Sequence, residues 1–253
     1  MLTLDQSLPS GALLGDETET FRDRLAGAGA FWLAARPAQA RIEAGVVTAW
    51  APMAGTRSAV PAAANAGRSE TADHCGHPIL QLRTEVNGGF VVPDIAPEAD
   101  RFTLAVIYAA PEAEARTLLS LRLGPADGAN LFFLSHTDGL LVAKDRAGGV
   151  GVELPLPNRQ PDFRLVIVSW DRTRLLLKTG SIQAESRGKL DGVQGPVDLF
   201  IGCRGHRKGL TKTLGNARIA DVVFWPGRAL LAPRGVEDAD QMAALQSYAR
   251  WQY

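Results

Sequence analysis

Residues 163–180 read FRLVIVSWDRTRLLLKTG. The first eight, FRLVIVSW, are almost continuously apolar, which is typical of a strand in the centre of a sheet. In residues 173–178, and in 181–186 just beyond, basic and polar side chains interrupt the apolar ones. This pattern is expected where one face of a strand meets water. The stretch therefore predicts neighbouring β-strands rather than a helix.

Short apolar segments continue on both sides of this stretch. They predict strands near residues 89–92, 102–109, 117–123, 130–135, 139–144, 150–155, 163–169, 173–178, 181–186, 197–202 and 217–225. The segments are separated by turn-forming pairs: Asp127-Gly128, Asp138-Gly139, Gly148-Gly149 and Asp191-Gly192. Such pairs accept the positive backbone φ of tight hairpins. Because no long amphipathic helices alternate with these strands, the sequence predicts an all-β sandwich or barrel.

The two ends of the chain differ from this pattern. Near the start, Asp16 or Thr18 is placed to cap a short helix that runs towards Leu25. Residues 51–78, rich in Pro, Ala, Gly and Asn, predict a long surface loop. Beyond Pro233, a helical period predicts a helix that closes one end of the sandwich. Its apolar face comprises Val236, Ala239, Met242, Leu245 and Ala249.

Composition and charge exclude several classes of protein. The chain has 253 residues, 46% of them hydrophobic, and 27 basic residues balance 27 acidic ones. A balanced charge gives no indication of a nucleic-acid partner. No apolar run is long enough to insert into a membrane, and the first residues lack the basic start of a secretory signal. The sequence therefore predicts a protein made in the cytoplasm without a signal peptide.

Three segments resemble the concanavalin A-like lectin/glucanase superfamily, in particular its laminin G-like branch. Residues 163–180 resemble the central hairpin of that family, and LFIG at 199–202 resembles its following strand. LGNARIADVVFWPGRAL at 214–230 resembles its last long strand, with Arg228, Ala229 and Leu230 opening the C-terminal helix. FTLAVIYAAP at 102–111 and TLLSLR at 117–122 fit two earlier strands in the expected order.

The resemblance implies an all-β, two-sheet antiparallel jelly-roll sandwich with a short C-terminal helix over residues 31–253. Residues 1–30 then form a separate N-terminal docking segment. Domains of this fold most often bind carbohydrate without chemistry, although a fold does not fix a function. Glucanases of the superfamily carry acids spaced Glu-x-Asp-x-x-Glu on one strand, so that they share a face. Here Glu153 stands alone and Asp191 lies in a turn, so we expect no enzymatic activity.

Two sets of residues raise the question of a metal. His74-Cys75-Gly76-His77 and Cys203-Arg204-Gly205-His206 contain both cysteines. A zinc site of Cys75, His77, Cys203 and His206 is one reading, and a Cys75–Cys203 disulfide is another. The irregular spacing favours unlinked residues, and we expect neither a metal nor another cofactor. Asp127, Asn130 and Asp138 are oxygen ligands of the kind that calcium prefers, but turn formation explains them better.

The densest basic run, RGHRKGLTK at 204–212, supplies the main candidates for sugar contact: Arg204, His206, Arg207 and Lys208. Arg offers a two-pronged match to a carboxylate or sulfate group of an acidic polysaccharide. A solvated loop is the alternative reading of this run. His136 and Asp138, in SHTDG, are further candidates at an expected hairpin tip. Among the five tryptophans, Trp170 and Trp225 end apolar strands and are expected to pack internally.

A lectin-like fold without an export signal suggests a particle that is assembled in the cytoplasm and released by lysis. The leading hypothesis is a non-catalytic surface spike, fibre or decoration protein of a phage-like particle, such as a gene transfer agent. It would recognise bacterial surface polysaccharide, contact other particle subunits through residues 1–30 and form a homo-oligomer. Two alternatives remain: a structural connector that binds no sugar, and a divergent glycan hydrolase or lyase.

Overall fold

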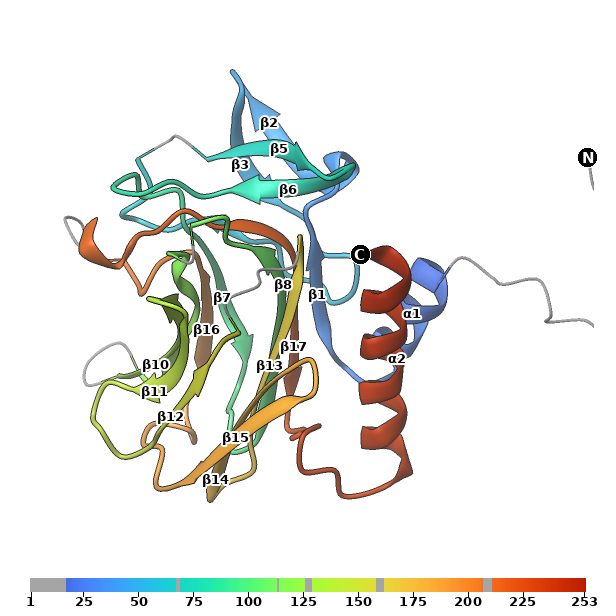
Figure 1. Ribbon diagram of the computed structural model, residues 1–253, viewed down its shortest axis with the longest axis vertical. Coiled ribbons are helices and arrows are strands. Elements are labelled where there is room, and N and C mark those ends of the chain that lie inside the picture. The colour runs from blue at the N-terminus through green and yellow to red at the C-terminus, as the bar shows by residue number, and fades with distance from the viewer. Residues whose placement is uncertain (1–16, 67–68, 113, 126–128, 158–161, 207–210) are drawn as a thin grey trace, which may run out of the picture.

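The computed structural model describes residues 17–66, 69–112, 114–125, 129–157, 162–206 and 211–253. Across these ranges the strands form two large sheets packed face to face, with a small hairpin beside them (Figure 1). Every strand pair within these ranges is antiparallel. The expected all-β jelly-roll sandwich is therefore confirmed.

The first sheet, which we call the helix-side sheet, has two helices against its outer face (Figure 1). Within the described residues its order is β15 (Ile182–Arg187), β14 (Arg174–Thr179), β13 (Arg164–Trp170), β8 (Phe102–Ala109), β17 (Arg218–Pro226), β6 (His77–Gln81) and β5 (Glu70–His74), and β1 (Phe31–Ala34) also pairs with β17. The helices are α1 (Glu17–Gly27) and α2 (Val236–Gln252).

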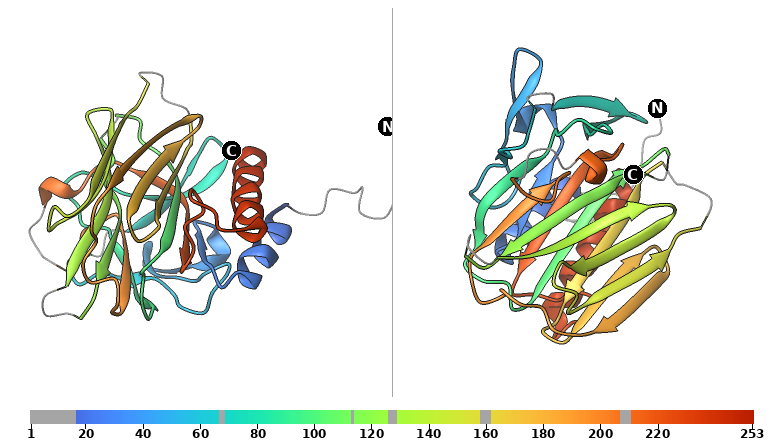
Figure 2. Two further views of the ribbon diagram at one scale, coloured as in Figure 1. Left: turned by 90° about the horizontal axis from the view of Figure 1, so that it is seen from below. Right: turned by 90° about the vertical axis from the view of Figure 1, so that its left-hand side faces the viewer.

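The second sheet, which we call the loop-side sheet, carries no α-helix on its outer face among the described residues; a loop that includes the short 3-10 helix η2 (Thr211–Thr213) lies there instead. Its order is β12 (Gly151–Pro155), β11 (Leu140–Asp145), β10 (Asn130–Thr137), β9 (Arg116–Leu123), β16 (Val197–Ile201), β7 (Phe90–Ala96) and β4 (Val60–Pro61). β2 (Ala40–Glu43) and β3 (Val46–Trp50) form a separate hairpin. Figure 2, right, shows the β10–β12 part of this sheet facing the viewer, with α2 behind.

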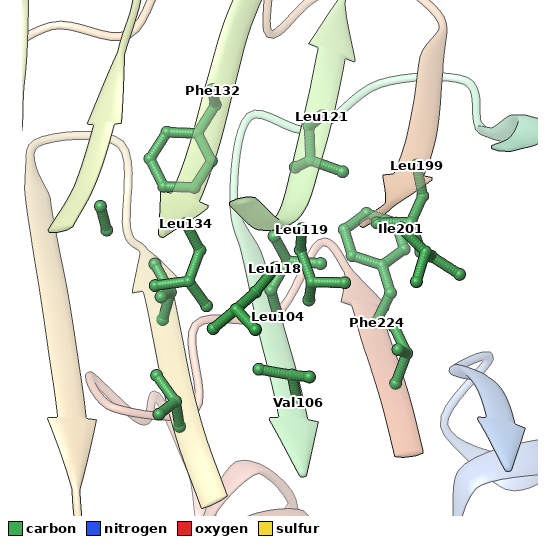
Figure 3. Close-up of a cluster of buried hydrophobic side chains, with 14 of the residues drawn as sticks. Leu104, Val106, Leu118, Leu119, Leu121, Phe132, Leu134, Leu199, Ile201 and Phe224 are labelled. Carbon is green, nitrogen blue, oxygen red and sulfur yellow. The ribbon is translucent and has the colours of Figure 1, made fainter. Parts of the chain in front are cut away.

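The core fills the space between the two sheets. Strand alternation, interrupted by register shifts in the β9–β10 and β8–β17 pairs, sends side chains of β8, β9, β10, β16 and β17 inward, where they are almost fully buried. Figure 3 shows ten of these side chains labelled: Leu104, Val106, Leu118, Leu119, Leu121, Phe132, Leu134, Leu199, Ile201 and Phe224. The pairing of Val168 with Leu104 and of Val166 with Val106 brings core residues side by side on adjacent strands.

Strand β13 explains why residues 163–170 are almost continuously apolar. Val166 and Val168 face the core between the sheets, whereas Ile167 belongs to a second buried cluster on the helix side. Burial of both faces removes the usual alternation of apolar and polar side chains. β15, at the edge of the sheet, instead has exposed or half-exposed side chains throughout.

Helix α1 packs against β1 and α2 through its buried apolar residues. Phe21 stacks on Tyr248 of α2 with ring centroids 4.6 Å apart, and its ring lies edge-on to Trp32 of β1 at 5.0 Å. Leu25 of α1 is also buried in this cluster. The helix expected towards Leu25 is therefore confirmed, but Thr18 lies inside it rather than at its cap. The docking role of residues 1–30 stays a prediction, and residues 1–16 lie outside the described ranges.

A buried carboxylate links the elements on the helix side of the molecule. Asp221 of β17 is fully buried and accepts hydrogen bonds from Trp32 Nε1 at 2.7 Å and from the hydroxyl of Tyr248 at 3.3 Å. The Tyr253 hydroxyl also donates to it. Burial raises the pKa of Asp221, and these hydrogen bonds act in the opposite direction. One side chain thus links a strand of the sheet to β1 and to the end of α2.

The sequence-based outline needs three corrections. Residues 51–78 are not one surface loop, because Glu70–His74 and His77–Gln81 pair as a hairpin at the edge of the helix-side sheet. Cys75 and Gly76 make its tight turn, with φ of 53° and 82°. Arg228–Leu230 precede α2 rather than open it, since the helix begins at Val236. Strands are confirmed over the segments from 89 to 225, and so is the existence of a C-terminal helix. The helix lies against the outer face of the helix-side sheet rather than closing one end of the sandwich (Figure 1), and of its expected apolar face Leu245 is buried whereas Val236 is exposed.

Candidate functional site

The chain that leaves β16 lies across the outer face of the loop-side sheet. The Gly202 amide donates to the Leu118 carbonyl at 2.8 Å, and the Ser120 hydroxyl donates to the Cys203 carbonyl at 2.9 Å. Further along, Leu214 pairs with Arg116 as an isolated bridge. Cys203 and Leu214 are buried in a small apolar cluster with Ala62, Val91 and Phe200. These contacts fix the start and the end of the basic run against β9 and β10.

Arg204 is held by two contacts with the sheet beneath it. Its guanidinium carbon lies 3.8 Å from the centroid of the Phe133 ring, a cation–π contact, and its Nε donates to Thr117 Oγ1 at 3.0 Å. Burial lowers the pKa of Arg204, although a guanidinium keeps its charge in a protein. Among the described residues, no hydrogen bond or ion pair engages its two terminal nitrogens.

A polar pocket of about 400 Å³ lies at this place. Its described lining is Glu114, Arg116, Thr137, Asp138, Arg204, Lys212 and Thr213. The lining has three cations against two carboxylates, and one carboxylate is occupied on both oxygens. Glu114 Oε1 accepts from the Asp138 amide at 3.1 Å, and Glu114 Oε2 accepts from Arg116 Nε at 3.3 Å. The described lining of the pocket therefore keeps an excess of one positive charge. We call it the Arg204 pocket.

Two of the candidates from the sequence, Arg204 and Asp138, thus come together in one pocket. Asp138 has a φ of 53° and forms the β10–β11 turn with Gly139, as its turn reading predicted. His206 lies elsewhere: its ring packs edge-on against Phe200, and its Nδ1 accepts from the Ala63 amide at 3.0 Å. Arg207 and Lys208 lie outside the described residues, so their contact with sugar stays a prediction.

His136 is not at the hairpin tip where the sequence placed it. Its side chain is only 2% exposed, because it follows Phe132 and Leu134 on the inward-facing side of β10. Its Nδ1 and the Tyr108 hydroxyl form a hydrogen bond of 3.0 Å, while its Nε2 is buried without a partner among the described residues. Burial, aided by Arg164, lowers the pKa of His136 to about 4. An imidazole in this position does not reach a ligand on the surface.

The two Cys/His pairs lie in different environments. Cys75 is exposed in the β5–β6 turn beside His74, whereas Cys203 is buried beneath the loop and its pKa is raised to about 11 by that burial. No cluster of three or more His, Cys, Asp or Glu side chains suited to a metal exists among the residues that the structure describes. Asn130 donates to Asp145 Oδ2 at 3.2 Å, and Asp127 falls outside those residues.

Four of the five tryptophans are buried: Trp32, Trp50, Trp170 and Trp225. The expectation of internal packing for Trp170 and Trp225 is confirmed. Trp251, near the end of α2, is 61% exposed. In the described part of the chain, neither helix is both long enough and apolar enough to cross a membrane.

Sequence reasoning missed Glu114, Arg116, Thr117 and Phe133 as parts of the site. Thr117 and Phe133 face outward on the loop-side sheet beside the core residues Leu118 and Phe132. Their outward direction follows from strand alternation, which was readable in the sequence. Their contact with Arg204 depends on the path of the loop after β16, for which the sequence carries no signal.

Comparisons with known proteins show the fold and no more. No protein-family model matches the sequence, and no curated protein matches it. A solved structure of Trypanosoma rangeli sialidase in complex with sialic acid superposes with a TM-score of 0.58 at 13% identity. The alignment covers 90% of this chain but 37% of the sialidase, so this chain spans well under half the length of that enzyme.

Two shorter alignments are looser. Domain 4 of an extracellular arabinanase from Geobacillus stearothermophilus, in complex with arabinotriose, has a TM-score of 0.48 at 13% identity and covers 69% of this chain and 81% of its own. A Ruminococcus gnavus sialidase CBM40 bound to sialyllactose has a TM-score of 0.39 at 16% identity and covers 51% and 76%. The chain is thus similar in fold to a part of the Trypanosoma rangeli sialidase chain, and its site must be judged on its own residues.

Proposed function

We propose that this protein is a non-catalytic carbohydrate-binding domain whose ligand is an acidic glycan held in the Arg204 pocket. The observation that carries the proposal is the Arg204 side chain. Phe133 and Thr117 hold it in place, yet its terminal nitrogens have no partner among the described residues. Planar guanidinium groups bind carboxylate or sulfate through two parallel hydrogen bonds. A pre-positioned arginine loses little side-chain freedom when such a ligand binds.

The surroundings support an acidic rather than a neutral sugar. Lys212 and Arg116 line the same pocket, and Glu114 is already engaged with Arg116 and with the Asp138 amide. The excess positive charge favours an anion, and Asp138 and Thr137 offer acceptors or donors for sugar hydroxyls. Phe133 does not offer a free face for sugar stacking on this side, since Arg204 covers it.

The absence of catalysis is part of the proposal. Glycoside hydrolysis needs two carboxyl groups of which one gives a proton while the other acts as base or nucleophile. In the Arg204 pocket, both oxygens of Glu114 serve as acceptors for protein donors, which suits a structural role. The rival reading is a hydrolase that uses Glu114 and Asp138. Release of new reducing ends from an acidic polysaccharide, lost in Glu114→Gln and Asp138→Asn, would favour that rival.

The wider role that we propose is in a phage-like particle, as a spike, fibre or decoration protein that recognises bacterial surface polysaccharide. The arrangement of the molecule supports separate surfaces for docking and for sugar binding. α1 lies on the helix side, so that docking through residues 1–30 and binding at the Arg204 pocket would use opposite faces (Figure 2). Capsid and tail genes beside the reading frame, together with the protein in purified particles, would support this role. A neighbouring sugar-utilisation operon and absence from particles would contradict it.

The ligand test compares Arg204→Met with Arg83→Met, a matched control. Arg83 is exposed and paired with Glu70 away from the pocket. Calorimetry with polyuronate and sulfated oligosaccharides should show binding by the parent protein and by Arg83→Met. In Arg204→Met the affinity should fall at least about tenfold, the scale of one charge-assisted hydrogen bond. Absence of acidic-glycan binding by the parent protein, or equal binding by Arg204→Met, would overturn the proposal.

A further inference from the structure

A second pocket, of about 500 Å³, lies at the N-terminal end of α2. Its lining includes three arginines, Arg101, Arg228 and Arg234, and the first residues of the helix. In Figure 1 this end of α2 is the lower one, beyond the end of β17. It shares no lining residue with the Arg204 pocket.

Arg101 is the unusual member of this lining. The residue is only 8% exposed, yet its Nε and Nη2 are buried with no hydrogen-bond partner among the described residues. It forms no ion pair within 4.0 Å with any residue that the structure describes. Asp238 and Asp171 attract this charge from a distance, but a buried guanidinium whose nitrogens have no acceptor is costly, because it loses its hydration without a hydrogen bond in return. Native proteins rarely leave such a group unsatisfied without a ligand, ion or water to meet it.

The carboxylates near Arg101 are engaged elsewhere. Asp238 Oδ1 accepts from Arg228 at 3.0 Å and its Oδ2 accepts from the Arg234 amide at 3.0 Å, while Glu237 accepts from Arg228 at 2.7 Å. Burial, together with the positive charges of Arg234 and Arg172, lowers the pKa of Arg101. The three arginines of the described lining, set against its two acids, leave one net positive charge, and both acids are directed to Arg228 or to the Arg234 amide rather than to Arg101.

The helix itself adds to this positive region. α2 has 17 residues, and Gly235 at its N-cap provides no side-chain cap. The first amides of a helix have no partner within it, and the helix dipole puts partial positive charge at this end. Anions bind readily at such a place when a cationic side chain joins the amides.

We propose that this pocket binds a tetrahedral oxyanion, phosphate or sulfate, between Arg101, Arg234 and the first turn of α2. A volume of about 500 Å³ exceeds that of a free phosphate ion several-fold, which leaves room for a monoester such as a sugar phosphate. The proposal does not depend on acidic-glycan binding in the Arg204 pocket, and either can fail alone.

The test measures thermal stability in chloride buffer, with sodium phosphate or sulfate replacing chloride at constant ionic strength. For the parent protein, 20 mM of either anion should raise Tm by about 3–6 °C, because a ligand that binds only the folded state stabilises it. Arg101→Met should melt no lower than the parent protein without the anions, since it removes an unpaired buried charge. It should show no rise when they are added.

Three further measurements test whether the anion binds in this pocket and which anion it is. Arg83→Met should keep the full rise, whereas loss of the whole rise in Arg204→Met would place the anion in the Arg204 pocket and overturn the proposal. Arg234→Gln changes an exposed residue, so it tests the site even if Arg101→Met fails to fold, and its rise should shrink by half or more. Glucose 6-phosphate that binds tenfold more tightly than phosphate would identify an ester as the ligand, and equal binding would identify the free ion. No rise in the parent protein, or an undiminished rise in Arg101→Met or Arg234→Gln, would overturn the proposal.

Discussion

The outer faces of the two sheets are built in opposite ways. On the helix side, α1 and α2 cover the sheet, and the polar group at the centre, Asp221, has donors from Trp32, Tyr248 and Tyr253. On the loop side, a loop lies across the sheet, and the central polar group, Arg204, is anchored through its Nε while its terminal nitrogens have no partner among the described residues. A polar group with all its partners inside the protein stabilises the fold, whereas one with partners missing is suited to a ligand.

This difference shows how one sandwich can separate stability from binding. The helix-side network ties together segments that are about 190 residues apart in sequence, since Trp32 and Asp221 lie 189 positions from each other. The loop-side site rests on side chains that strands β9 and β10 orient anyway. We therefore expect changes on the helix side to affect folding, and changes in the Arg204 pocket to affect binding alone.

The largest effect is expected for Asp221→Ala. This change leaves the buried Trp32 indole and two tyrosine hydroxyls without their acceptor, and should lower the free energy of unfolding by about 3–5 kcal/mol. Asp221→Asn keeps an acceptor and removes a buried charge, so it should lower the free energy of unfolding by about 1 kcal/mol or less. Urea unfolding at pH 7 measures both. Equal losses for the two variants would mean that the carboxylate does not organise the helix side.

A smaller effect is expected from His136, inside the loop-side sheet. Its pKa is lowered to about 4 in the folded protein, against about 6.5 in the unfolded chain. Between these values the unfolded chain binds the extra proton, so stability is full above pH 6.5 and is lost as the pH falls towards 4. At pH values below 4, the free energy of unfolding should be lower by about 3 kcal/mol than at pH 7.

The pH profile of unfolding, compared between the parent protein and His136→Asn, isolates this contribution, because the other three histidines remain in both. His136→Asn should flatten the profile between pH 6.5 and 4. Parallel profiles would show that the imidazole is not held in its neutral form.

The smallest effect on stability is expected for Arg204→Met. One partly exposed cation–π contact and one hydrogen bond are worth about 1 kcal/mol or less, and methionine still packs on Phe133. In urea unfolding, the loss of free energy of unfolding should therefore be several-fold smaller for Arg204→Met than for Asp221→Ala. A loss as large as that of Asp221→Ala would erase the contrast between the two faces and make Arg204 a structural residue.

The sequence predicted much of the fold because local patterns carry it. Residues 102–109 match β8 from end to end, and the turn pairs Asp138-Gly139 and Gly148-Gly149 lie between observed strands. The strands before residue 82 were missed for physical reasons. β1 is a four-residue strand with all its side chains buried, and β5 is polar enough to look like a loop. β1 and β6 both pair with β17, more than 130 residues later, and β5 joins the sheet through β6.

The site was less predictable than the fold. Arg204 was found because charge density is visible in a sequence, and Asp138 because it marks a turn. His136 was misplaced, although its spacing from Phe132 and Leu134 gave a signal for burial. Arg101 carried no signal at all: its lack of partners arises only when β8, the 226–235 segment and α2 come together. Contacts of this kind are set by tertiary packing and not by a local motif.

The position of α1 and α2 has a practical consequence for immobilisation. Because both helices lie behind the helix-side sheet, a linker coupled to an exposed helical residue, such as Glu19 or Trp251 changed to a reactive residue, would anchor the molecule from the rear. Every tethered copy would then turn its loop-side surface outward (Figure 2). A sensor chip or bead coated in this way would display the molecules in a uniform orientation, as an array of parallel receptors.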